Sequence, residues 1–233
     1  MRATLLIAFN FLRQMRWLLL IYSLIAIAFG LGLALQNEII KSEDVEFFFG
    51  QQAFYAVGIA TLLAAQANLN ERKSRRILGV LSKGIERKDY LAGLLGGVVA
   101  VSAVFEAGVL LGAVCIIARS RFSFSQVFAA VMLMWLSCCL SAAIAMFFST
   151  FLNPFLAVGA TFILIGSGWA AQRIGTWGNA VFPVYQLNLD ASQLLQNART
   201  QPVLIPVAVL EIIIFWLLAG WIFERRDIAV AIE

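Results

Sequence analysis

The sequence predicts an all-α integral membrane protein, a bundle of six transmembrane helices, from three observations. Of its 233 residues, 62% are hydrophobic and only 13% are charged, whereas a soluble domain is about 25% charged. The mean hydropathy is +0.90. The apolar residues fall into segments of about 20 residues, the length that crosses a bilayer as a helix. The alternation typical of barrel strands is absent, so helices are the expected spanning elements.

Six segments qualify as spans, and together they form one domain over residues 1–233. Four of them contain no charged residue, whereas Glu106 is the single charge of the third and Glu211 that of the sixth. The expected spans are residues 17–35, 52–69, 91–118, 122–149, 154–172 and 202–223.

The distribution of Lys and Arg predicts the orientation. Twelve of the 17 basic residues fall before the first span, in the loop after the second span, and after the last span. The first outer loop is instead acidic. Basic loops stay in the cytoplasm, so we expect both termini there. Anionic lipid headgroups and topology account for the net charge of +4, and no nucleic-acid partner is expected. The acids of the first outer loop are Glu38, Glu43, Asp44 and Glu46.

Residues 1–16 precede the first span and have an amphipathic pattern. On a helix, Leu5, Ala8 and Leu12 share one side, and Arg13 and Arg16 lie on another. This favours a helix at the cytoplasmic membrane interface. A simple extension of the first transmembrane helix is the alternative.

The loop over residues 71–90 is dense in charge and contains a short apolar run. Ile77, Leu78 and Leu81 would share one face of a short helix, and Gly84 is a natural stop for it. A short amphipathic helix in the cytoplasm has the form of a docking element. The alternative is a basic anchor that only sets the topology.

This loop resembles the cytoplasmic loop of ABC-2 type transporter permeases. Arg75 and Arg76 stand where that family has Gly-Thr, Gly84 where it has Pro, and Leu94 where it has Lys. The broken segment 173–201 resembles the re-entrant helical hairpin before the family's last span, and the tail after Phe223 resembles its Phe-x-Arg-Arg-Asp ending. The matching loop residues are Glu71, Arg72, Ile77, Val80, Leu81, Ile85, Arg87 and Gly93.

The resemblance implies a permease subunit of an ATP-driven exporter in the bacterial cytoplasmic (inner) membrane. Its expected partners are a second permease copy or a paralogue, two ATPase subunits that bind ATP and Mg, and membrane lipids. The expected cargo is a lipid-like, glycan or other amphipathic compound, and a haem-exporter-like permease is the alternative within the superfamily. The residues that would couple to the ATPase are Glu71, Arg72, Arg75, Arg76, Ile77, Leu78, Leu81 and Arg87.

The chain itself is not expected to be an enzyme or to hold a cofactor or metal. It contains no histidine and no phosphate-binding G-x-x-x-x-G-K-[ST] motif, so ATP hydrolysis is assigned to another chain. The three cysteines, in apolar stretches, are expected to be packing residues. Gly93 and Gly97, like Gly108 and Gly112, form GxxxG motifs that predict close helix packing.

Two acids inside the spans, Glu106 and Glu211, are the candidate functional residues. A charged group at the bilayer centre is costly, and such residues usually face the bundle interior or a polar cavity. They would line the substrate path or the dimer seam, or else be protonated packing residues bonded to Ser102, Ser137 or Ser141. A proton-coupled carrier that uses both acids and a membrane scaffold remain alternative functions.

Overall fold

The chain folds into a helical bundle. The computed structural model describes residues 2–36, 40–73, 87–117, 122–171, 183–184, 187–188, 191 and 203–225. Within these ranges there are helices and no strand. The helices are α1 (Arg2–Gln14), α2 (Arg16–Gln36), α3 (Ser42–Lys73), α5 (Arg87–Ile117), α6 (Phe124–Ser149), α7 (Pro154–Ala171) and α10 (Leu204–Arg225).

Five helices of the described part are long and apolar enough to cross a membrane: α2, α3, α5, α6 and α10. The chain is therefore built as a multi-pass helical membrane protein, as its composition predicts. α7, the predicted fifth span, has a shorter apolar stretch, Pro154–Ser167. The predicted hairpin 173–201 lies largely outside the described residues.

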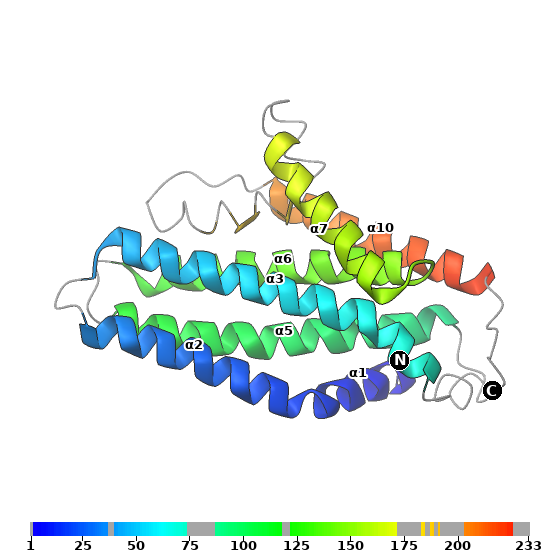
Figure 1. Cartoon of the computed structure of the whole chain (residues 1–233), viewed down its shortest axis with the longest axis horizontal. Helices are drawn as coiled ribbons and strands as arrows, with labels where there is room; N and C mark the ends of the chain where they lie inside the picture. Colours follow the sequence, from blue (N-terminus) through cyan, green and yellow to red (C-terminus); the bar gives the residue numbers. More distant parts are fainter. Residues whose placement is uncertain are drawn as a thin grey trace.

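The long helices run antiparallel along one axis. Figure 1 shows that α2 and α5 end, and α3 and α6 begin, at one end of the bundle, while α3, α6 and α10 end, and α1 and α5 begin, toward the other. The second end therefore collects the helix termini at Lys73, Arg87 and Arg225. We call it the basic end.

The first turn of α3 corrects one prediction. Glu43, Asp44 and Glu46 were expected in an outer loop, but they belong to α3, which begins at Ser42. Acidic side chains are favourable at a helix N-terminus because of the helix dipole. The Asp44 carboxylate also accepts a hydrogen bond of 3.2 Å from the Lys41 backbone N–H.

Local signals set the starts of two other helices. Ser123 caps α6 in a capping box with Gln126. The Asn153 side chain accepts a 2.9 Å hydrogen bond from the Leu156 N–H at the start of α7, and Pro154 occupies the first turn, where its missing N–H does no harm.

α5 and α6 form the centre of the bundle. α6 packs against α3, α5, α7 and α10, and α5 packs against α1, α2, α3, α6 and α10. Small side chains allow this central position, since Ala142, Ala143 and Ala145 of α6 are completely or almost completely buried. Close packing of small residues is the main source of helix association in lipid.

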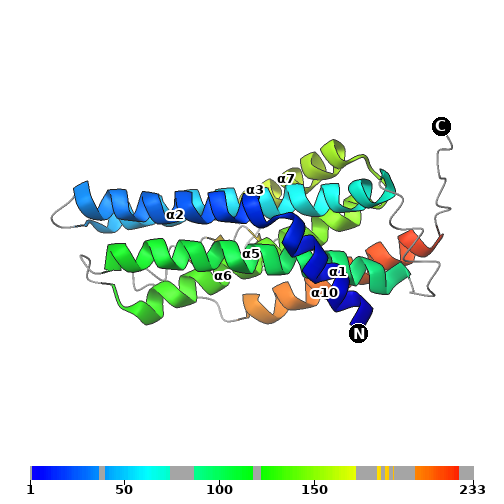
Figure 2. The same ribbon diagram turned by 90° about the horizontal axis from the view of Figure 1, so that it is seen from below.

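α1 is a helix in its own right. A turn at Met15 separates it from α2, and Figure 2 shows the two helices meeting at an angle beside α5. α1 packs closely on α5 through the first GxxxG motif: a Cβ at Gly93 would lie 2.9 Å from Ile7 Cβ, and one at Gly97 would lie 2.8 Å from Phe11 Cβ. The apolar side of α1 thus lies partly on protein.

α2 packs against the second GxxxG motif of α5. A Cβ at Gly108 would lie 2.8 Å from Ser23 Cβ, and one at Gly112 would lie 2.6 Å from the Ala26 carbonyl oxygen. Gly30 of α2 is in turn packed against the Gly112 backbone. Both motifs therefore act as packing surfaces on one helix, which confirms that prediction.

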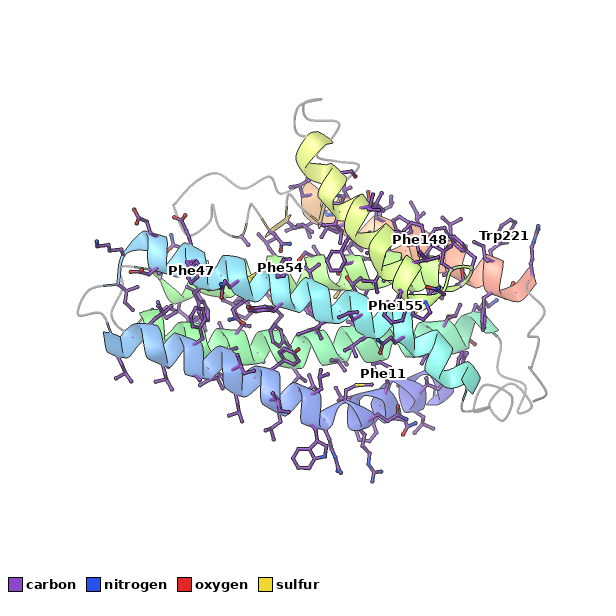
Figure 3. The ribbon with its side chains drawn as sticks, in the orientation of Figure 1. Phe11, Phe47, Phe54, Phe148, Phe155 and Trp221 are labelled. Carbon is purple, nitrogen blue, oxygen red and sulfur yellow. The ribbon has the colours of Figure 1, made fainter. Side chains whose placement is uncertain are left out.

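The outer surface of the bundle is apolar. Figure 3 shows side chains that project from it, and Phe155 and Phe54 are among the most exposed. Such a surface is stable where lipid tails cover it.

Candidate functional site: two cavities beside α7

The first cavity lies between α6, α7 and α10 and has a volume of about 410 Å³. Among the described residues, Glu211 of α10 is the only charged one that lines it, and Pro183 and Val184 line it as well. The remaining walls are the apolar side chains Ile144, Leu164, Ile165, Ile214 and Phe215.

A second cavity, of about 400 Å³, lies between α3 and α7. Phe49 and Phe54 of α3 and Phe162 of α7 supply aromatic walls, and Asn188 supplies an amide. Ile165 of α7 lines both cavities. Two cavities that are mainly apolar in their described lining thus flank α7. Each has one strongly polar side chain among the described residues, and their sizes are typical of small-molecule sites.

A hydrogen bond from the central helix α6 positions the Asn188 side chain. The Ser137 hydroxyl lies 2.8 Å from Asn188 Oδ1 and 2.7 Å from the Met134 carbonyl oxygen. Its single proton can serve one of these acceptors at a time. No sequence signal singled out Asn188, because 51 residues separate it from Ser137.

Glu106 lies elsewhere, in the interface of α5 with α6. Its side chain is only 2% exposed. Cys138 of α6 donates to Glu106 Oε1 through an S–H···O contact of 3.7 Å. Oε2 has no hydrogen-bond partner within the described part of the chain. A buried oxygen without a hydrogen-bond partner lowers the stability of the fold. Packing by itself therefore does not explain why a carboxyl group lies here.

The serines suggested as partners of Glu106 bond elsewhere. Ser102 donates to the Val99 carbonyl at 2.9 Å, and Ser141 donates to the Cys138 carbonyl at 2.9 Å. Ser137 bonds as described above. A hydroxyl in a helix readily bonds to the carbonyl one turn earlier, which explains why these serines do not turn to the carboxyl group. Cys138, expected only to pack, is the residue that contacts it.

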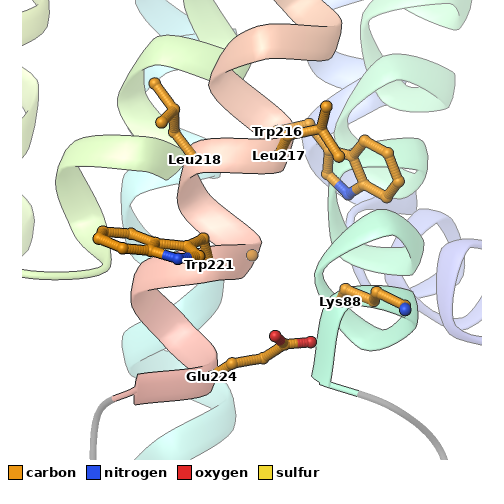
Figure 4. Close-up of a pocket in the computed structure, with 7 residues that line it drawn as sticks. Lys88, Trp216, Leu217, Leu218, Trp221 and Glu224 are labelled. Carbon is orange, nitrogen blue, oxygen red and sulfur yellow. The ribbon is translucent and has the colours of Figure 1, made fainter.

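A third cavity, of about 490 Å³, lies at the basic end between α5 and α10. Figure 4 shows Lys88 and Glu224 on the two helices that border it, with Trp216 and Trp221 on α10. Gly220 lies beside Lys88, since a Cβ on it would make an ordinary contact of 3.5 Å with Lys88 Cβ. The C-terminal part of α10 thus packs beside the first turn of α5.

The predicted coupling residues fall on both sides of a gap in the described chain. Glu71 and Arg72 belong to the last turn of α3, and Arg87 begins α5. The others, Arg75, Arg76, Ile77, Leu78 and Leu81, lie outside the described residues.

Within the described ranges, no group of three or more His, Cys, Asp or Glu side chains could hold a metal ion. Comparison of the sequence with protein-family models and with curated proteins finds no match.

Proposed function

We propose that this chain is the permease subunit of an ABC-2 type exporter, powered by ATP hydrolysis in separate subunits. The observation that carries the proposal is that α3 ends at Lys73 and α5 begins at Arg87, both at the basic end, while the sequence between them has the expected coupling pattern. With 32 and 31 residues, these two helices are each roughly 46–48 Å long at about 1.5 Å per residue. A hydrocarbon core of about 30 Å leaves part of each helix outside it.

We expect a soluble ATPase subunit to dock where α3 ends and α5 begins. A force applied there would reach α5 directly, and α5 packs against five of the described helices. In the proposed assembly, two ATPase subunits and a second permease copy or paralogue complete the transporter, with the basic end in the cytoplasm of a bacterium. ATP and Mg bind to the ATPase subunits.

The two cavities beside α7 support an amphipathic or lipid-like substrate. Their walls are mostly apolar, and the Glu211 carboxyl group and the Asn188 amide each give one polar contact. Such a combination suits a molecule with an apolar body and a small polar group.

The proposal is tested by co-purification in detergent. The tagged chain should recover an ATPase subunit, and Leu81→Glu should abolish the recovery because it places a charge on the apolar docking face. Gly79→Glu is the matched control: on the expected helix it adds the same charge on the side opposite Leu81. Equal recovery with both variants, or no ATPase with the unaltered chain, would refute the proposal.

A proton-coupled carrier is the second candidate, and the buried Glu106 with its unpartnered Oε2 favours it. Transport by a carrier would stop when the proton gradient is dissipated, even with ATP present. Transport by the proposed exporter would continue as long as ATP is supplied.

A further inference from the structure

The angle between α1 and α2 leaves a groove on the outer surface of the bundle. It has a volume of about 450 Å³ and is formed by α1, α2 and α5. Leu12, Leu19, Leu20 and Val104 give it apolar walls, and Arg13 and Arg16 also line it.

The charged residues known to line this groove are both positive. Both arginines are exposed, and among the residues that the structure describes no acidic one lines the groove. Residues 1–37 contain no Asp or Glu at all, so α1 and α2 have no acid of their own to neutralise the two guanidinium groups.

The position of Arg16 gives a second reason to expect a bound anion in the groove. Arg16 is the first residue of α2, where the helix dipole disfavours a positive charge and an anion would be stabilising. Its guanidinium carbon also lies 5.6 Å from the centre of the Trp17 ring, a contact that turns the cation toward the aromatic face.

The position of the groove relative to the membrane surface is consistent with a bound lipid. Arg16 and Trp17 stand at the polar end of the first candidate span, Arg16–Leu35. Tryptophan is enriched at the level of the headgroups, and basic residues attract anionic lipids there. Leu19 and Leu20 follow within the apolar part of the span, so the groove passes from a cationic end to an apolar one.

We infer that this groove binds an anionic phospholipid taken from the surrounding membrane. The two guanidinium groups donate hydrogen bonds to the phosphate oxygens, a geometry that suits arginine well. An acyl chain lies along Leu20 and Val104. The site is distinct from the cavities beside α7, and its occupation does not depend on the proposed transport function.

The test measures lipid binding to the full chain, purified in detergent and depleted of lipid. Phosphatidylglycerol and phosphatidylcholine with identical acyl chains are titrated separately, and bound lipid is counted by native mass spectrometry. The unaltered chain should prefer phosphatidylglycerol. Arg13→Gln combined with Arg16→Gln should weaken phosphatidylglycerol binding about 30-fold, which corresponds to about 1 kcal/mol for each cation removed.

Two further variants locate the site. Arg225→Gln is the matched control, because Arg225 is an exposed arginine of α10 that lies over Trp221 at 4.0 Å and should leave the preference unchanged. Val104→Trp fills the floor of the groove without a change in charge and should weaken binding of both lipids.

The proposal is overturned if the arginine double variant keeps the preference, or if Arg225→Gln reduces it equally, since that would indicate general surface charge. Inorganic phosphate at the concentration of the lipid phosphate should not displace phosphatidylglycerol. Full displacement would overturn the lipid assignment in favour of a free phosphate site.

Discussion

The contact of α2 with α5 allows a sharp test of the packing, because two glycines of one helix have opposite surroundings. Gly30 is buried, and a Cβ added to it would lie 2.8 Å from Gly112 Cα and 2.7 Å from the Gly112 carbonyl carbon. At Gly32, two residues further along α2, an added Cβ meets nothing within 4 Å. Gly30→Ala and Gly32→Ala therefore make the same chemical change in different environments.

The expected free energies of unfolding follow from two opposing effects. Alanine is better than glycine in a helix interior by up to about 1 kcal/mol, and this benefit applies at both positions. At Gly30 the obstacle is backbone, which cannot rotate aside, so the helices must move apart. Overpacking of this kind is destabilising by roughly 1–3 kcal/mol. Gly30→Ala should thus be destabilising by up to about 2 kcal/mol net, whereas Gly32→Ala should be neutral or stabilising.

The assay is equilibrium unfolding of the purified chain in micelles, followed by tryptophan fluorescence. Gly112→Ala should reproduce the loss seen for Gly30→Ala, since its added Cβ would lie 2.6 Å from a carbonyl oxygen of α2. If Gly30→Ala were as stable as Gly32→Ala, α2 and α5 would not approach each other as closely as the structure shows, and the reasoning would be wrong.

Three other predictions concern separate parts of the bundle. Gly97→Ala should loosen α1 from α5 and make α1 more sensitive to limited proteolysis, while Gly96→Ala, whose added Cβ would make an ordinary 3.7 Å contact, should not. Ser123→Ala removes the cap of α6 and should lower the free energy of unfolding by about 1 kcal/mol; Ser123→Asp, which keeps a capping oxygen, should restore most of it. Glu106→Gln and Glu211→Gln should each impair transport with no loss of folded protein by size-exclusion chromatography, and full transport in both variants would remove these acids from the mechanism.

Several features of the fold could be predicted from the sequence because the bilayer imposes them. A segment without charges, about 20 residues long, must form a helix to satisfy its backbone hydrogen bonds in lipid. This identified α2, α5, α6 and α10 with small errors at their ends. The start of α3 was less predictable, because its acidic first turn has the composition of a loop although the helix dipole stabilises it.

The candidate site was much less predictable. Glu106 and Glu211 were conspicuous as lone acids in apolar spans, yet their surroundings differ: one contacts Cys138, 32 residues away, and the other lines a cavity beside α7. Asn188 and Cys138 gave no signal, since a polar amide in a connecting segment and a cysteine in an apolar helix are common in any membrane bundle.

By itself, the sequence determined the helical class, most of the spans, the amphipathic character of α1 and the presence of two small-residue motifs on α5. Only the tertiary structure decided which helix packs against each motif, that Gly30 completes the contact of α2 with α5, and where cavities remain. The physical reason is that lipid tails are as apolar as a packed helix face. Hydrophobicity therefore shows that a residue lies in the membrane, but only the close approach of backbones shows which faces meet.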